Sequence, residues 1–483
     1  MKKLYVLAGM LSVQLVLAQS TSLNVVAVEN SGLPSTTFGS VASGEVGGKK
    51  ALLFTGEVQE SNEAYGQVRT QLYLYNGTTF VKDTNANFQA IKNGQGIFVD
   101  VDKDQDEDVV LIGRGSNDRD LHFKVYENTN GNFSLKQDLN GEGLNYASID
   151  AGDYDADGDL DLLVTGKNAS GTRQIFIYQN NDGTFEKKTL SGVKGISQGD
   201  AKFVKLSKDN GDKLDFVTAG MRTERDGTVE VYKQNTDGSF RLSQDLEQVE
   251  GKWIGTETAN LAVVDTDKDG VTDYVAAIGR TYEDFTPLYK NQSGNLSLHT
   301  QDIPRLTGNH GKNSAHFTDL DGDNTYELIF VEQENGETPR AFIYKVVSEG
   351  VSEITTPTIE FGLEGSIAVL DYDSDGDLDL YITGNDKNGE AKSAIYRNQK
   401  ITLSNKEVVA EEKVILYPNP VSQSFAIKGM ENPLQISILD MSGKLVKTFA
   451  AQSQYDVSSL PKGHYNVVIK GKKDSKTLKM IKK

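Results

Sequence analysis

The chain contains no cysteine, so disulfide bonds cannot contribute to its stability. It is also poor in proline, with 9 in 483 residues, and in positive charge, with 50 Lys and Arg against 69 Asp and Glu. The resulting net charge of −19 argues against nucleic acid and anionic membranes as partners, because both would repel the protein. Cations are the favoured partners, and a bound metal could supply the cross-links that disulfides cannot.

Long hydrophobic runs are lacking beyond the N-terminus. A basic start at Met1 is followed by an apolar stretch from Leu4 to Leu17 and then by small residues. This pattern predicts a secretory signal peptide over residues 1–18, with cleavage after Ala18. A membrane anchor is the alternative, but roughly fourteen apolar residues are too few to span a bilayer comfortably. We therefore expect an exported protein without a transmembrane segment after cleavage.

An aspartate-rich motif is repeated along the chain. The copy "DYDADGDLDLLVTG" at Asp153 recurs as "DVDKDQDEDVVLIG" at Asp100, "DTDKDGVTDYVAAIG" at Asp265, "DLDGDNTYELIFVE" at Asp319 and "DYDSDGDLDLYITG" at Asp371. A degraded copy starts at Ser207, and "SGEVGGKKALLFTG" at Ser43 keeps the apolar run and the glycine but has lost the acids. Successive copies start about 50 to 60 residues apart, which makes seven units.

Each unit has the pattern of four strands. One strand precedes the acidic stretch, one follows it, and a hairpin such as "IFIYQNNDGTF" adds two more. Four strands repeated seven times predict an all-β fold, a seven-bladed β-propeller over residues 19–403. A β-helix with acidic repeats is the alternative, but its period is far shorter. We attribute a recurring small residue before each acidic stretch to the crowded innermost position of a blade: Thr37, Gly94, Ala147, Ala201, Ala259, Asn313 and Gly365.

The acidic stretches have the spacing of calcium-binding loops. Calcium takes six to eight oxygens in irregular geometry, so carboxylates at positions one, three, five and nine of a tight loop can surround it. Glycine at position six permits the positive φ that the turn needs. Magnesium is disfavoured because it requires a strict octahedron. The predicted ligands are Asp100, Asp102, Asp104 and Asp108; Asp153, Asp155, Asp157 and Asp161; Asp265, Asp267, Asp269 and Asp273; Asp319, Asp321, Asp323 and Glu327; and Asp371, Asp373, Asp375 and Asp379.

The copies differ in quality. Gln105 replaces the glycine of the first loop and is expected to strain its turn, whereas Asn324 suits left-handed backbone. The degraded loop has Gly211 at position five and is expected to bind weakly or not at all. Solvated acidic turns are the alternative interpretation, but five copies in fixed register argue against it. About five calcium ions would add roughly ten positive charges, in a structural role because the loop ligands saturate the ion.

These units resemble the FG-GAP or VCBS repeats of integrin-α-type propellers, over residues 37–398. The resemblance rests on "D-x-D-x-D-G-D-x-D-L" leading to a glycine and later to "Y-x-N-x-x-G-x-F". It implies that calcium binds between the first two strands of a blade. Residues 23–33, "LNVVAVENSGL", resemble the strand that follows each hairpin and are a candidate to complete the last blade; "ITLS" from Ile401 competes for that place.

After the repeats, residues 404–412 are predicted to form a charged linker and residues 413–483 a small β module. The alternation of apolar and polar residues also fits an ordinary immunoglobulin-like end domain. The module nevertheless resembles the type A sorting domain of the bacterial type IX secretion system, which implies an Ig-like β-sandwich, contact with the secretion machinery, and release or attachment at the outer-membrane surface. The matching pieces are Pro418-Asn419-Pro420, Asp440 with Gly443-Lys444, Leu460-Pro461 with Gly463 and Tyr465, and the lysines Lys479, Lys482 and Lys483.

Catalytic motifs are not evident in the sequence. It has no nucleophile elbow, zinc motif or phosphate loop, and its five histidines are scattered over different units: His122, His299, His310, His316 and His464. The one tryptophan, Trp253, could stack on a sugar or be partly buried. We therefore predict a secreted or surface-attached monomer that is not an enzyme and binds glycan or protein as an adhesion module. A polysaccharide lyase or hydrolase and a surface-layer component are the alternatives.

Overall fold

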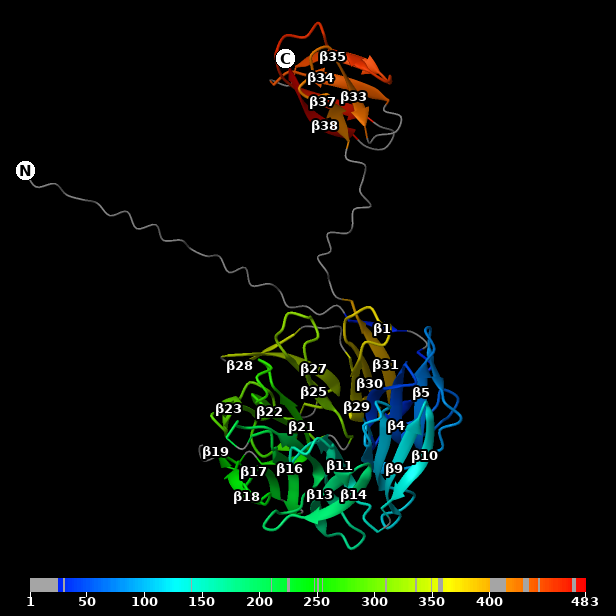
Figure 1. The fold of residues 1–483 in the computed structure, drawn as a ribbon, viewed down its shortest axis with the longest axis vertical. Coiled ribbons are helices and arrows are strands. Elements are labelled where there is room, and N and C mark those ends of the chain that lie inside the picture. The colour runs from blue at the N-terminus through cyan, green and yellow to red at the C-terminus, as the bar shows by residue number, and fades with distance from the viewer. Residues whose placement is uncertain are drawn as a thin grey trace, which may run out of the picture. The chain divides into compact units, whose positions relative to one another are not determined.

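The computed structural model describes residues 25–28, 31–139, 141–209, 211–223, 226–246, 248–249, 252–253, 255–308, 311–334, 337–348, 350–354, 359–399, 414–428, 434–441, 444–470 and 475–483 (Figure 1). The chain divides into two compact units, Met1–Lys400 and Ile401–Lys483. Every described element is a strand, which confirms the all-β class. The signal peptide predicted over residues 1–18 and the linker predicted over 404–412 lie outside the described residues.

The first unit contains seven antiparallel sheets of four or five strands and a short hairpin. The first three sheets consist of β2 (Ser35–Thr37), β3 (Val41–Val46), β4 (Lys49–Gln59), β5 (Gln67–Tyr75) and β6 (Phe80–Lys82); β7 (Lys92–Val99), β8 (Asp108–Arg114), β9 (Leu121–Thr129) and β10 (Asn132–Asp138); and β11 (Asn145–Gly152), β12 (Asp161–Lys167), β13 (Arg173–Asn181) and β14 (Thr184–Thr189).

The next three sheets consist of β15 (Ser197–Val204), β16 (Asp215–Thr223), β17 (Asp226–Gln234) and β18 (Phe240–Asp245); β21 (Thr256–Val264), β22 (Tyr274–Thr281), β23 (Leu288–Gln292) and β24 (Asn295–Thr300); and β25 (Ala315–Thr318), β26 (Glu327–Glu332), β27 (Arg340–Val347) and β28 (Gly350–Glu353). The hairpin of β19 (Gln248–Val249) and β20 (Lys252–Trp253) precedes the fifth sheet.

The seventh sheet closes the ring with a strand from the other end of the chain. It contains β29 (Leu363–Leu370), β30 (Asp379–Asn385) and β31 (Ala391–Asn398), and its fourth strand is β1 (Val25–Val28). β1 pairs antiparallel with β31, from Val25 opposite Asn398 to Val28 opposite Ile395. The expectation that the N-terminal segment completes the last sheet is thus confirmed, and the competing "ITLS" lies outside the described residues.

The sheets surround a centre that their first strands line (Figure 1). Each first strand contacts the next in chain order, from β7 through β29, and β29 contacts β3 of the first sheet. Side chains accept backbone hydrogen bonds across these contacts: Gln95 Oε1 accepts from the N–H of Ile149 at 3.1 Å, and Ser366 Oγ accepts from the N–H of Val41 at 2.9 Å. Apolar clusters between neighbouring sheets form the core. Buried side chains of two sheets therefore share each interface.

A backbone bulge explains the recurring small residues. Near the start of most first strands one non-glycine residue has positive φ, such as Asn93 at 47°, and the pairing register shifts there. The next residue lies against the second strand of its own sheet: a Cβ on Gly94 would be 2.0 Å from Ile112 O. Our attribution to crowding at the innermost position was therefore wrong. In the first and fourth sheets the position belongs to Gly39 and Gly199, whose added Cβ would each lie 2.1 Å from a carbonyl oxygen, and not to Thr37 and Ala201. In the sixth sheet the predicted Asn313 is itself the residue with positive φ, so the position after it is Ser314.

The second unit folds around its own apolar core, which includes Phe425, Ile436 and Tyr455. It consists of a three-stranded and a four-stranded antiparallel sheet. Their strands are β32 (Ile415–Tyr417), β33 (Ser424–Lys428) and β36 (Tyr455–Asp456); and β35 (Leu445–Ala450), β34 (Gln435–Leu439), β37 (Gly463–Lys470) and β38 (Ser475–Lys482). Among the residues that the structure describes, there is no helix with the length and apolarity needed to cross a bilayer.

Candidate metal sites and central cavities

Each acidic loop joins the first and second strands of a sheet. The five loops, which we call the acidic loops, are residues 100–108, 153–161, 265–273, 319–327 and 371–379. The first carboxylate shapes the turn: Asp153 Oδ1 accepts from Asp157 N–H at 3.1 Å, and Oδ2 accepts from Gly158 N–H at 3.0 Å. Asp371 makes the same pair of bonds. These bonds hold the loop backbone in a coil with its first carboxylate inside.

Position six has positive φ in all five acidic loops, at Gln105, Gly158, Gly270, Asn324 and Gly376. Gln105 reaches 72° without glycine. Position four also has positive φ, a feature that we did not expect: Lys103, Ala156, Lys268, Gly322 and Ser374. Two left-handed residues per loop, rather than one, therefore produce the turn.

The ninth carboxylate is buried and ties the loop to the rest of its sheet. Asp161 is fully buried; Oδ2 accepts from Tyr154 N–H at 3.1 Å, and Oδ1 accepts from Asn180 N–H on β13 at 2.8 Å. Burial, with Asp155 and Asp157 nearby, raises the pKa of Asp161 to about 7 despite these bonds. The same desolvation raises the pKa of Asp379 to about 7. A neighbouring cation would remove this penalty, because it favours the charged form.

The structure brings three carboxylates together in each acidic loop, with ligand oxygens within 4.8 Å of one another. The groups are Asp100, Asp102 and Asp108; Asp153, Asp155 and Asp161; Asp265, Asp267 and Asp269; Asp319, Asp321 and Glu327; and Asp371, Asp373 and Asp379. Position five joins the group only in the third loop, where Asp273 does not. The other predicted ligands at position five, Asp104, Asp157, Asp323 and Asp375, lie outside these groups.

The donor set suits a hard divalent cation. Each group offers only carboxylate oxygens, which calcium prefers. Several of these oxygens are buried and accept no hydrogen bond: Asp100 Oδ1, Asp102 Oδ1, Asp155 Oδ1, Asp319 Oδ1, Glu327 Oε1 and Asp373 Oδ1. A buried acceptor without a partner is costly, and a bound cation would satisfy it. The residues present therefore fit calcium.

Basic side chains approach several acidic loops. Lys136 Nζ lies 2.7 Å from Asp102 Oδ2, and Arg397 Nε lies 2.7 Å from Asp373 Oδ2. The Lys136 contact holds the pKa of Asp102 below its usual value. These side chains offset part of the negative charge of the loops, and a metal ion would compete with them for the same carboxylates.

The degraded loop keeps the structural contact of the ninth residue. Asp215 is buried, and its Oδ1 accepts from Gln234 N–H at 2.9 Å, as Asp161 does from Asn180. No group of three candidate ligands forms there among the described residues. The ninth carboxylate thus has a role in the sheet that does not depend on a complete set of acids, and our sequence reasoning missed this role.

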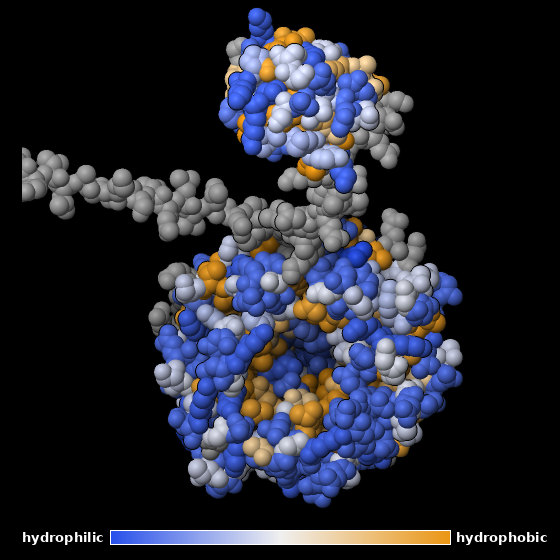
Figure 2. Space-filling view, turned by 45° about the horizontal axis from the view of Figure 1, so that its top comes forward, coloured by the Kyte–Doolittle hydropathy of each residue, from blue (hydrophilic) through white to orange (hydrophobic). Residues whose placement is uncertain are grey.

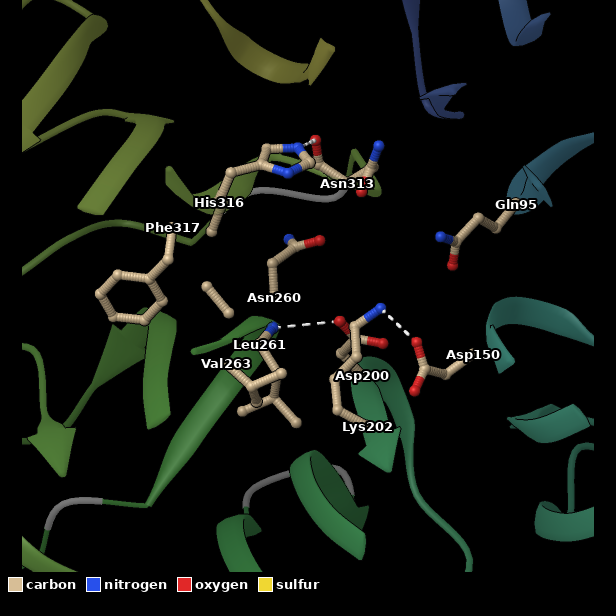
Figure 3. Close-up of a pocket in the computed structure, with 12 residues that line it drawn as sticks. Gln95, Asp150, Asp200, Lys202, Asn260, Leu261, Val263, Asn313, His316 and Phe317 are labelled. Carbon is tan, nitrogen blue, oxygen red and sulfur yellow. Dashed lines mark hydrogen bonds and ion pairs between the residues drawn. The ribbon is translucent and has the colours of Figure 1, made fainter. Parts of the chain in front are cut away.

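A polar cavity of about 190 Å³, which we call the central cavity, lies among the first strands of five sheets (Figure 3). Asp150 and Lys202 form an ion pair in it at 2.9 Å. Burial alone would lower the pKa of Lys202, but Asp150 and Asp200 hold it above its usual value. Asn260 is 2% exposed, and its Oδ1 accepts no hydrogen bond. Figure 2 shows a hollow on the face turned to the viewer, with hydrophobic side chains along its wall.

Residues 311–313, which we call the crossing segment, connect first strands of several sheets. Lys312 N–H donates to Gly39 O at 2.7 Å, and its Nζ donates to Gly199 O. Asn313 Nδ2 donates to Val41 O at 2.8 Å. β25 follows the crossing segment and has only 4 residues, against 8 in β7. Burial lowers the pKa of Lys312 to about 8.

A second cavity of about 290 Å³, which we call the Glu57–Glu364 cavity, lies where first strands begin. Phe38, Glu57, Lys92, Asn93, Arg114, Tyr146 and Glu364 line it. β7 runs from Lys92 in this cavity to Val99 just before an acidic loop, so the cavity and that loop lie at opposite ends of the strand. Sequence analysis did not find this site, because its residues come from four different sheets.

The histidines do not form a catalytic group among the described residues. His316 lines the central cavity, and burial lowers its pKa. His122 lies 2.9 Å from Asp120, His299 lies beside Tyr274, and His464 belongs to the second unit. His310 and the side chain of Trp253 lie outside the described residues, so the sugar-stacking prediction for Trp253 is not tested.

A closed ring of antiparallel sheets with acidic loops between first and second strands defines a β-propeller built from acidic-loop repeats. Residues 100–164 match the family described as FG-GAP-like repeat, and residues 415–483 match the secretion system C-terminal sorting domain. The chain thus contains an FG-GAP-like repeat within its propeller and a C-terminal sorting domain, and this domain indicates secretion or cell-surface attachment through the type IX system.

The solved structures that match this chain share little sequence with it. The periplasmic gluconolactonase PpgL of Pseudomonas aeruginosa is 12% identical with a TM-score of 0.41, and the match covers 66% of this chain and 85% of that one. AofleA from Arthrobotrys oligospora is 13% identical with a TM-score of 0.38, over 70% and 92%. A comparison with curated proteins found no match.

Proposed function

We propose that the propeller is a calcium-stabilised module that binds glycan or protein outside the cell. The observation that carries the calcium part is the set of five carboxylate groups, with buried oxygens that lack hydrogen-bond partners. All five groups lie between the first and second strands of a sheet, so each ion would stabilise the turn that joins these two strands. Calcium binding would provide the stability that disulfides provide in other exported proteins.

The binding role is supported by the location of the protein and by its cavities. The sorting domain delivers the propeller to the outside of the cell, where external ligands are accessible. The central cavity and the Glu57–Glu364 cavity both combine charged side chains with apolar or aromatic ones, as ligand sites do. Ions held in the acidic loops would be coordinated by carboxylates of the protein and would serve stability rather than catalysis.

An array experiment tests this function. The full-length chain is applied to glycan and protein arrays in calcium and again in excess chelator. We expect retention on a defined set of ligands in calcium and weaker retention in chelator. Retention on nothing in either condition would contradict the proposal.

A polysaccharide-degrading enzyme is the second candidate, and the Glu57–Glu364 cavity is the observation that favours it. Glycoside hydrolysis requires two carboxyl groups that face one site and differ in protonation. Lys92 pairs with Glu57, whereas burial, aided by the charge of Glu57, raises the pKa of Glu364. Incubation with a polysaccharide panel separates the candidates: new reducing ends or unsaturated products that vanish in Glu364→Gln would establish the enzyme.

A further inference from the structure

The Glu57–Glu364 cavity contains a cation with few internal partners. The side chain of Arg114 is 15% exposed, and its Nε is buried without a hydrogen bond. That Nε lies 3.4 Å from Oδ1 of Asp118, its ion-pair partner among the described residues, and the Asp118 side chain is 79% exposed. By contrast, the second cation, Lys92, is paired directly with Glu57. The Arg114 guanidinium thus has donor capacity that the protein does not use, and a planar guanidinium is suited to binding a carboxylate through two hydrogen bonds.

Two aromatic side chains border the same cavity. Phe38 and Tyr146 are half-buried and belong to none of the apolar clusters of the described residues. Both have positive φ, at 54° and 52°, which is uncommon for bulky residues. Phe38 N–H donates to Glu364 O at 3.0 Å, and Asn93 N–H donates to Phe38 O at 2.6 Å. Tyr146 N–H donates to Asn145 Oδ1 at 3.0 Å. The cavity therefore has rigid apolar faces beside its charged groups.

Polar groups suited to hydroxyls complete the lining. Asn93 is 7% exposed, and it lines the cavity. Glu57 and Glu364 provide acceptors, and Asn385 Nδ2 donates to Glu364 Oε2 at 3.3 Å. The lining combines two cations, Lys92 and Arg114, with two acids, Glu57 and Glu364, so its formal charges balance. This balance contrasts with the net charge of −19 for the whole chain.

We propose that the Glu57–Glu364 cavity binds one carboxylate-bearing sugar ring, a uronate unit of an acidic polysaccharide. Arg114 binds the carboxylate of the sugar. Phe38 and Tyr146 contact the apolar faces of the sugar ring. Asn93 and Glu57 form hydrogen bonds with the sugar hydroxyls. The volume of about 290 Å³ is at the lower limit of ligand pockets, so it suits a single ring. This inference rests on the proposed binding function and names its ligand class.

The test compares galacturonate with galactose, which differ by the carboxylate alone, and then their oligosaccharides. Calorimetric titration of the full-length chain in calcium is expected to show about tenfold or tighter binding of the acidic sugar. Arg114→Gln should abolish that preference, and Arg114→Lys should retain part of it. Arg241→Gln removes an exposed arginine of β18 and is the matched control, with no expected change. Unchanged melting temperatures establish that the variants fold.

Equal binding of the two sugars, or an acidic preference that survives Arg114→Gln, would overturn the inference. The proposed function can survive that result. If the array shows retention on other glycans or on proteins, the propeller is a binding module that uses another surface. If the array shows no retention at all, the proposed function fails along with the inference.

Discussion

The ninth residue of an acidic loop should have two separable roles, one in the sheet and one in metal binding. Asp161→Asn removes the charge and one of two acceptors, so one of the N–H groups of Tyr154 and Asn180 loses its partner. That loss costs about 1 to 3 kcal/mol, reduced by relief from the repulsion of the neighbouring acids. Asp215→Asn is the matched control, because Asp215 makes the same contact, with Gln234, in a loop without a carboxylate triad.

Calcium should separate the two variants. At a calcium concentration about 100 times the Kd of a site, binding stabilises the folded state by about 2.7 kcal/mol. Differential scanning calorimetry of the full-length chain should therefore show a larger loss for Asp161→Asn in calcium than in chelator. Asp215→Asn should show the same loss in both. Equal losses for Asp161→Asn in the two conditions, or a calcium-dependent loss for Asp215→Asn, would refute the reasoning.

Three further perturbations test other parts of the fold. Val25 on β1 is 1% exposed, so Val25→Asp should destabilise the closed ring by about 3 kcal/mol or more. Val26 is 44% exposed, and Val26→Asp should not have this effect. Chemical unfolding measures the free energy of unfolding of both variants. Gly384→Ala would place a Cβ 2.5 Å from the Gly362 backbone and should cost about 1 to 3 kcal/mol more than Gly389→Ala, which also has positive φ but open space. Burial lowers the pKa of Lys312 from 10.5 to about 8, so the unfolded state binds more protons in that interval. Between pH 8 and 10.5 the free energy of unfolding should therefore rise by about 3 kcal/mol relative to that of Lys312→Met. Identical pH profiles of the two proteins would refute the lowered pKa of Lys312.

The repeat made much of the propeller predictable from the sequence. Alternating acids followed by an apolar run and a glycine locate the first loop and second strand of each sheet, because both the turn and the strand depend on local residue types. The likeness of residues 23–33 to the strand after each hairpin made them a candidate for the last sheet, and residues 25–28 do pair there. The glycine at the end of the motif, such as Gly166, lies against the bulge at the start of the first strand. A Cβ added to Gly166 would lie 2.9 Å from the Cβ of Leu144.

Features that depend on contacts between sheets could not be predicted. The carboxylates of Glu57 and Glu364 are far apart in sequence, and only the closure of the ring brings them into one cavity. The crossing segment carries no local signal, since the side chains of Lys312 and Asn313 donate hydrogen bonds to the fourth and first sheets, which are far away in sequence. The second role of Asp161 likewise depends on Asn180, which belongs to another strand.

Direct titration of the metal-free full-length chain with calcium tests the central claim, that the acidic loops bind this ion. Isothermal titration calorimetry should show saturable binding that approaches five ions per chain, one for each carboxylate group. Magnesium should give a much weaker response, because it retains its waters in such loops. A titration with no saturable binding of calcium would contradict the account.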